Sequence, residues 1–312
     1  MRLMNRRKFI ANSVAATTAL TTPLAWAKSA WPQPATHSSA SADPSAGASA
    51  AAADHQVRPI GVQLYTVRSM MKTDLPGTIA KVAAVGYTEV EMAGYFDHSP
   101  KEVRAILDSN GLKSPSSHID YKVWESSMPS AIETAHTMGQ QFLVCAFIDE
   151  AQRKEPGGWK RAADLFARAG EECQKAGIQF CYHNHTFEFE PSPTLGGKLP
   201  YDFFLETLDP NTVKMELDLC WINVAGADPI AYFNKYPGRF PLVHVKDWKG
   251  QGGTMADEAT RLADVGQGNI DWKHIFANAG PAGIQHYFVE NDAAKGIDDI
   301  RISYQYLKDL RF

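Results

Sequence analysis

The sequence predicts an α/β protein with a (β/α)8 TIM barrel, and three observations favour this fold class. Short apolar segments alternate eight times with helical segments between residues 57 and 312. Five helical segments end at a glycine that leads directly into an apolar strand, as in AAVGYTEVEM and QKAGIQFCYH. Glycine readily adopts the left-handed conformation that caps a helix. The segment also has the length of one such barrel, about 250 residues.

The strands are the short runs rich in Val, Ile, Leu, Phe and Tyr that open each unit. A doubly wound sheet is the alternative fold. It normally carries a glycine-rich phosphate turn after its first strand, and the first strand here, GVQLYTVRSMM, is followed by none. The eight strands are expected at residues 59–65, 87–92, 113–118, 141–147, 178–185, 213–219, 240–246 and 285–291.

The helices between the strands show apolar residues at helical spacing. Residues 159–176 are the clearest case, because Trp159, Phe166 and Cys173 lie on one face of a helix that can pack against the sheet. A last helix over residues 297–310 is expected to close the chain.

The first 56 residues differ in composition from the rest. A pair of arginines in NRRKFI precedes an uncharged run, and AWA follows it, which is the order of a twin-arginine signal peptide over residues 1–27. Residues 28–56 are mainly Ala, Ser and Pro, which predicts a disordered linker. We therefore expect residues 57–312 to form one catalytic barrel in the periplasm, with no membrane attachment after cleavage.

Charge and cysteine placement exclude several classes of function. Without residues 1–27 the chain has 27 basic and 35 acidic residues, a formal charge of −8. A protein this acidic has no general attraction to nucleic acid or anionic lipid, which argues against an endonuclease. The cysteines lie in apolar segments and form no CxxC pair, which predicts buried free thiols. They are Cys145, Cys173, Cys181 and Cys220.

Polar residues gather at the C-terminal ends of the predicted strands, where TIM barrels carry their active sites. Any one of them alone would be interpreted as a satisfied core residue. Six strand ends that direct acids or imidazoles toward one axis would repel one another without a cation. Imidazoles mixed with carboxylates favour Mn, Zn, Co or Fe over Ca. The residues that gather at these strand ends are Glu91, His118, His183, His185, Glu188, Glu216, Asp218, Trp221, His244, Lys246, Asp247 and Glu290.

Alternation along a strand indicates which of these side chains share a face. Residues two apart point the same way, so His183 and His185 face the axis together while Asn184 points outward. The same rule places Glu216 on the face of Asp218.

Five motifs in order, YHNHTFEF, ELDLCW, HVKD, VGQGNIDW and VEND, resemble the sugar phosphate isomerase/epimerase group of xylose isomerase-like barrels. The resemblance covers essentially all of residues 57–312. It implies a divalent metal, commonly Mn, held by one residue from each of strands five to eight. By position, Asp218, His244 and Glu290 match the ligands of strands six, seven and eight.

Strand five departs from the family pattern, because better-known members carry a glutamate there. Counting from Gly177 places His183 at that position. His185 and Glu188 stay open as alternative ligands.

The chemistry that the resemblance implies is proton transfer through a metal-bound enediolate. Glu188, His185 and Lys246 are the expected catalytic residues: the first two as bases, and Lys246 as an oxyanion contact or proton donor. The alternatives are support of a ligand for the bases and a salt bridge for Lys246.

Three further residues are expected to touch the substrate. Glu91 is also a candidate base, His118 a contact or acid, and Trp221 an apolar wall against a sugar face. Each has a plainer interpretation as ligand support, capped core histidine or core packing.

The leading hypothesis is a periplasmic, metal-dependent sugar isomerase or epimerase. No Arg or Lys cluster marks a phosphate pocket, so an unphosphorylated sugar or keto-sugar is the expected substrate. A 3-keto-glycoside lyase or hydrolase acting by β-elimination is the alternative. A non-catalytic periplasmic sugar-binding protein is the alternative of another class. The sequence leaves the oligomeric state open.

Overall fold

The computed structural model describes residues 55–312, so the predicted signal peptide and nearly all of the predicted linker lie outside the described residues. Two backbone hydrogen bonds of 3.2 Å join His55 and Phe312, which ties the start of the described chain to its C-terminal residue. Within residues 55–312 no helix is both long enough and apolar enough to cross a membrane.

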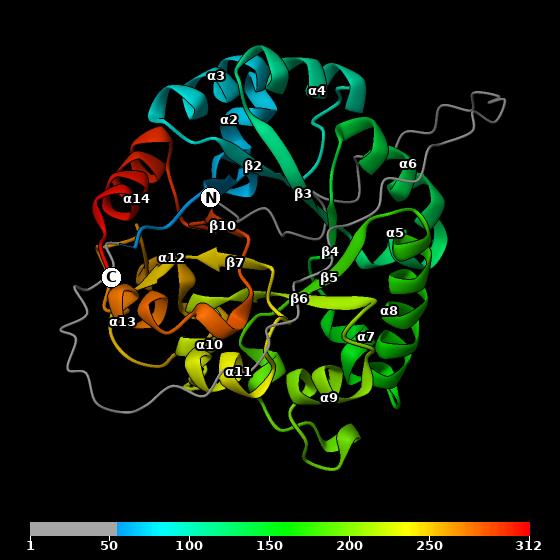
Figure 1. Cartoon of the computed structure of the whole chain (residues 1–312). Helices are drawn as coiled ribbons and strands as arrows, with labels where there is room; N and C mark the ends of the chain where they lie inside the picture. Colours follow the sequence, from blue (N-terminus) through cyan, green and yellow to red (C-terminus); the bar gives the residue numbers. More distant parts are fainter. Residues whose placement is uncertain (1–54) are drawn as a thin grey trace, which may run out of the picture.

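Eight parallel strands close into a barrel, which confirms the predicted fold class (Figure 1). The strands follow one another in the order β1-β10-β7-β6-β5-β4-β3-β2, and β10 closes the barrel by pairing with β1. All eight occur where the sequence predicts them, and most are shorter than predicted. They are β1 (Ile60–Gln63), β2 (Glu89–Met92), β3 (Lys113–Ile119), β4 (Phe142–Cys145), β5 (Gln179–His183), β6 (Val213–Asp218), β7 (Leu242–Val245) and β10 (His286–Val289).

The helices surround the strands (Figure 1). The last helix packs against both α3 and β1, so the end of the chain covers the seam where the barrel closes. The helices are α2 (Arg68–Thr73), α3 (Leu75–Val85), α4 (Pro100–Ser109), α5 (Tyr121–Ser126), α6 (Met128–Met138), α7 (Glu150–Lys154), α8 (Gly158–Lys175), α9 (Pro200–Thr207), α10 (Leu219–Val224), α11 (Pro229–Lys235), α12 (Glu258–Arg261), α13 (Trp272–Ala277) and α14 (Ile297–Asp309).

Helix α8 shows why the local sequence folds in this way. Its predicted apolar face is buried, including Trp159, Phe166 and Cys173. Gly177, just past its end, has φ +74°, a conformation that a side chain would strain. The chain can therefore turn at once into β5, which carries His183. All four cysteines are buried and free, as predicted.

A small antiparallel pair after β7 was not predicted. It joins β8 (Asp247–Trp248) to β9 (Leu262–Ala263). The Asp247 carboxylate accepts hydrogen bonds from the Trp272 indole N–H (3.1 Å) and from two backbone N–H groups of the VGQGNIDW segment. Gly268 passes so close that a Cβ there would lie 2.1 Å from Asp247 Oδ1. The HVKD and VGQGNIDW motifs are therefore parts of one anchored loop.

Candidate active site

Two groups of polar side chains lie inside the C-terminal end of the barrel. The first, called the metal-site group below, comprises the four residues that the resemblance implies as ligands. One ligand atom from each lies within 4.8 Å of the others. The second, called the floor group, lies one layer deeper in the barrel, since Glu216 precedes Asp218 by two residues on β6. The metal-site group is His183, Asp218, His244 and Glu290. The floor group is Glu91, His118 and Glu216, and all seven residues are buried.

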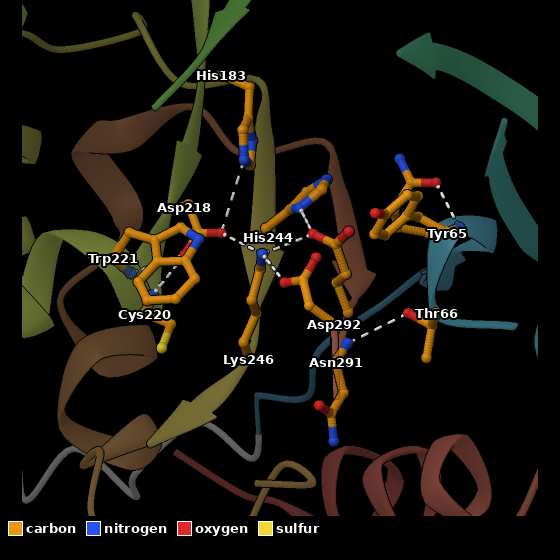
Figure 2. A network of polar contacts seen from close by, with 12 residues as sticks. Tyr65, Thr66, His183, Asp218, Cys220, Trp221, His244, Lys246, Asn291 and Asp292 are labelled. Carbon is orange, nitrogen blue, oxygen red and sulfur yellow. Dashed lines mark hydrogen bonds and ion pairs between the residues drawn. The ribbon is translucent and has the colours of Figure 1, made fainter. Parts of the chain in front are cut away.

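Asp218 has a carboxylate with two different environments. Its Oδ1 caps helix α10 by accepting hydrogen bonds from the backbone N–H groups of Cys220 (2.9 Å) and Trp221 (2.8 Å) (Figure 2). Its Oδ2 lies 3.8 Å from His183 Nε2. Neither of these two atoms has a hydrogen-bond partner among residues 55–312, although the Lys246 ammonium lies 3.2 Å from Oδ2 as an ion pair.

Buried polar atoms without hydrogen bonds are costly, so two of them facing each other call for a ligand. Their separation of 3.8 Å fits two atoms that bind the same ion at about 2.0–2.2 Å each. Burial lowers the pKa of His183 well below its usual range, which keeps the imidazole neutral, the form that binds metals. The donor set therefore fits a divalent metal.

Lys246 lies at the centre of the acidic side chains (Figure 2). Its ammonium lies 2.7 Å from Glu290 Oε2, 2.9 Å from Asp292 Oδ2 and 3.2 Å from Asp218 Oδ2. The salt bridge considered as the alternative role of Lys246 is therefore present. Three carboxylates around one ammonium carry excess negative charge in a buried site. Without a bound metal, His244 offsets part of it, because the Glu216 and Glu290 carboxylates raise the pKa of its imidazole well above its usual range despite burial. A bound cation would take over that role.

The structure brings the predicted substrate contacts Glu91 and His118 into the floor group. His118 Nε2 donates to Glu216 Oε2 at 2.6 Å, and its ring stacks on that of His244 with centroids 5.0 Å apart. Glu91 accepts from His244 Nε2 at 2.7 Å and from the Gln63 amide at 2.7 Å. These contacts match the plainer interpretations, ligand support for Glu91 and a capped core histidine for His118, while contact with substrate stays a prediction.

Glu188, in the short 3-10 helix η2 (Phe187–Phe189), was expected to be a base. Burial raises its pKa to about 7, which suits proton transfer near neutral pH. Its carboxylate also accepts hydrogen bonds from the Tyr182 hydroxyl and from the His185 backbone N–H (2.8 Å). Glu188 therefore fixes the loop that carries His185, and its role as a base stays a prediction.

Aromatic rings surround the other two predicted residues. The His185 ring stacks on Phe187 with an interplanar angle of 4° and lies 6.3 Å from the ring of Trp221. The Trp221 ring lies in turn 5.2 Å from the Lys246 ammonium. Trp221 is thus beside the acidic cluster, as a wall residue must be.

Two residues of the site were not identified from the sequence. Asp292 binds Lys246, and its position two residues after Glu290 was the signal that would have placed it on the same side. Asn184 was expected to point outward. It is buried, and its Oδ1 accepts the Asp218 backbone N–H at 3.0 Å, which links β5 to β6 beside the metal-site group.

Comparison with known proteins agrees with this architecture. Two inosose dehydratases, from Lacticaseibacillus casei and its strain BL23, are 24% identical over 253 residues; the matches cover 70% of this chain and 82% and 81% of theirs. A sugar phosphate isomerase/epimerase structure from Parabacteroides distasonis has 26% identity and a TM-score of 0.65, and the match covers 84% of this chain and 96% of that one.

The IolI protein with a bound zinc atom has the same fold. Its TM-score is 0.63 at 15% identity, and the match covers 79% of this chain and 95% of that one. The family model described as xylose isomerase-like TIM barrel matches residues 79–310. The chain belongs to the xylose isomerase-like TIM barrel family.

Proposed function

We propose that the protein is a divalent-metal-dependent sugar isomerase or epimerase that moves a proton beside the carbonyl of an unphosphorylated sugar or keto-sugar. The observation that carries this proposal is the pair of buried atoms, His183 Nε2 and Asp218 Oδ2, that face each other without hydrogen bonds among residues 55–312. His244 and Glu290 complete a set of two imidazoles and two carboxylates. Such a set favours Mn, Zn, Co or Fe over Ca.

The metal, when bound, supplies a Lewis acid that polarises the substrate carbonyl. Lys246 supplies positive charge and N–H donors at the same place, which stabilises negative charge that develops on a substrate oxygen. Glu188 and His185 are the groups proposed to take and return the proton, and the Trp221 ring provides a flat apolar surface for a sugar face.

The choice of an unphosphorylated substrate rests on charge. Lys246 is engaged by three carboxylates, so it is poorly suited to bind a phosphate dianion. We also propose export to the periplasm through the twin-arginine signal. Cell fractionation of the native chain and of a variant with Arg6→Lys and Arg7→Lys tests this location, since the variant should stay in the cytoplasm.

Elimination is a second candidate, favoured by the inosose dehydratase relatives. Loss of water, or of the alcohol of a 3-keto-glycoside, begins with the same proton removal next to a ketone. The same site can therefore support a keto-glycoside lyase, with the leaving group deciding the outcome.

One experiment tests the shared step and separates the candidates. The purified protein is incubated with a panel of keto-sugars and 3-keto-glycosides in D2O, before and after chelation and metal readdition. We expect metal-dependent incorporation of deuterium beside the carbonyl. A product of unchanged connectivity and formula supports isomerisation or epimerisation, and loss of water or alcohol supports elimination. Sugar binding without deuterium exchange would support the non-catalytic binding protein instead.

A further inference from the structure

The floor group has no role in the proposed reaction, yet one of its atoms, Glu216 Oε2, lies close to three imidazoles. Glu216 Oε2 lies 2.6 Å from His118 Nε2, 3.1 Å from His183 Nδ1 and 3.3 Å from His244 Nε2. Glu216 is buried completely. A buried carboxylate oxygen with three ring nitrogens around it holds those rings in fixed orientations.

The imidazoles of His183 and His244 each face both groups. His183 presents Nδ1 to Glu216 and Nε2 to Asp218. His244 presents Nε2 to the floor group and Nδ1 to Glu290, 2.8 Å away. Each ring therefore has one nitrogen toward each group. Nε2 of His183 faces the metal-site group, whereas in His244 that nitrogen is Nδ1.

An ionised carboxylate only accepts hydrogen bonds, so the ring nitrogen that faces it must carry the proton. The other nitrogen of a neutral ring then keeps its lone pair. This assigns the proton to Nδ1 in His183 and directs the lone pair of Nε2, which has no hydrogen-bond partner among residues 55–312, into the metal-site group. His244 presents both ring nitrogens to carboxylates, Nε2 to Glu91 (2.7 Å) and Nδ1 to Glu290 (2.8 Å), so the same rule assigns it no single tautomer.

We propose that Glu216 is a positioning residue that fixes the tautomer of His183 for metal binding. The inference rests on the proposed metal site and adds a residue that acts on the metal through its ligand His183. Carboxylates that hold a ligating histidine in this way raise metal affinity about 10–100-fold.

His118, His183, Glu216 and His244 also offer ligand atoms within 4.8 Å of one another. The direct hydrogen bond of 2.6 Å between His118 Nε2 and Glu216 Oε2 favours a hydrogen-bonded support over a second ion. The number of bound ions per chain tests this choice.

The first test uses the unaltered protein. Nitrogen-15 NMR of the zinc-loaded protein, with histidine labelled, reports which ring nitrogen carries the proton. We expect the proton of His183 on Nδ1. A proton on Nε2 instead would overturn the inference, whether or not any variant folds.

The second test compares variants. Glu216→Leu removes the acceptor and should lower Zn²⁺ affinity, measured by chelator competition, about 10–100-fold. It should also alter the visible spectrum of the Co²⁺ form. Glu216→Gln should recover most of both properties, because its carbonyl oxygen can replace Oε2, and Oε1 has no hydrogen-bond partner among residues 55–312. Glu89→Gln, at the far end of the barrel, is the matched control.

The outcomes separate this inference from the proposed function. A wild-type protein that binds no divalent metal contradicts both. One bound ion, with affinity and cobalt spectrum unchanged in Glu216→Leu, contradicts only the positioning role. Two bound ions per chain would assign the floor group to a second metal site and overturn the inference as stated.

Discussion

Histidines meet carboxylates at both ends of the barrel, and the two ends differ in what is left unpaired. At the N-terminal ends of the strands, His286 Nδ1 lies 2.7 Å from Glu89 Oε2, and the two side chains are about one-tenth exposed (12% and 11%). At the C-terminal ends, carboxylates outnumber the Lys246 ammonium, and His183 Nε2 and Asp218 Oδ2 have no hydrogen-bond partner among residues 55–312.

The two ends use the same strands, so residue type alone does not make the site. Glu89 and Glu91 share β2, and His286 begins the strand that leads to Glu290. At the N-terminal ends of the strands, His286 and Glu89 pair with each other and remain partly exposed to water. At the other end, complete burial and unequal numbers of charges create a demand for a cation. The excess of buried acceptor atoms, not their presence, distinguishes a metal site from a salt bridge.

Substitution of a predicted metal ligand should have the largest effect, and it should be seen in metal binding and turnover. We expect His183→Ala and Asp218→Asn to abolish measurable metal binding and turnover, a loss greater than the roughly 10–100-fold typical of residues that only orient a ligand. Asn keeps an oxygen that can cap α10, so the barrel should stay folded. Metal analysis and circular dichroism check both points, and full metal occupancy in either variant would exclude that residue from the ligand set.

Removal of the central cation should have the next largest effect. Lys246→Met leaves three buried carboxylates without their ammonium, which should lower the free energy of unfolding of the metal-free protein by about 3–5 kcal/mol. Saturating metal should reduce this loss, because the ion neutralises two of the same carboxylates. Urea unfolding with and without metal measures the difference, and an equal loss in both states would contradict a shared cation site.

The raised pKa of Glu188 predicts a pH dependence of stability. The folded state holds this proton up to about pH 7, while the unfolded state releases it near the usual carboxyl pKa of about 4.3. The folded state thus binds more protons in this interval, so stability falls as pH rises through it, by at most about 4 kcal/mol. Glu188→Gln should remove this fall. Chemical unfolding of both proteins from pH 5 to 8 measures it, and parallel curves would contradict the raised pKa.

Loss of the far pair should have the smallest effect. His286→Gln leaves Glu89 beside water with a weaker partner, which should cost about 1 kcal/mol of stability or less. Metal affinity and turnover should stay unchanged, because this pair lies at the opposite ends of the strands from the metal-site group. A clear loss of metal in this variant would contradict the separation of the two ends.

Much of this architecture can be predicted from the sequence, because the apolar periods and the glycines after helices are local signals. All eight strands and the gathering of polar residues at their C-terminal ends follow from them, whereas the choice of Asp218, His244 and Glu290 as ligands is implied by the family resemblance. The depth of each side chain does not, because depth depends on the register between strands. His183 on β5 pairs with Glu216 on β6, and this alignment puts Glu216 below the metal-site group rather than in it. Asn184 was missed for a related reason, since its partner belongs to the neighbouring strand.

Anomalous X-ray diffraction from crystals soaked in Zn²⁺ or Mn²⁺ tests the central claim most directly. The account predicts one strong anomalous peak at about 2.0–2.3 Å from His183 Nε2 and Asp218 Oδ2, with His244 and Glu290 completing the coordination. A barrel with these side chains in place and no peak among them, or with its peak at the His286–Glu89 end, would contradict the account.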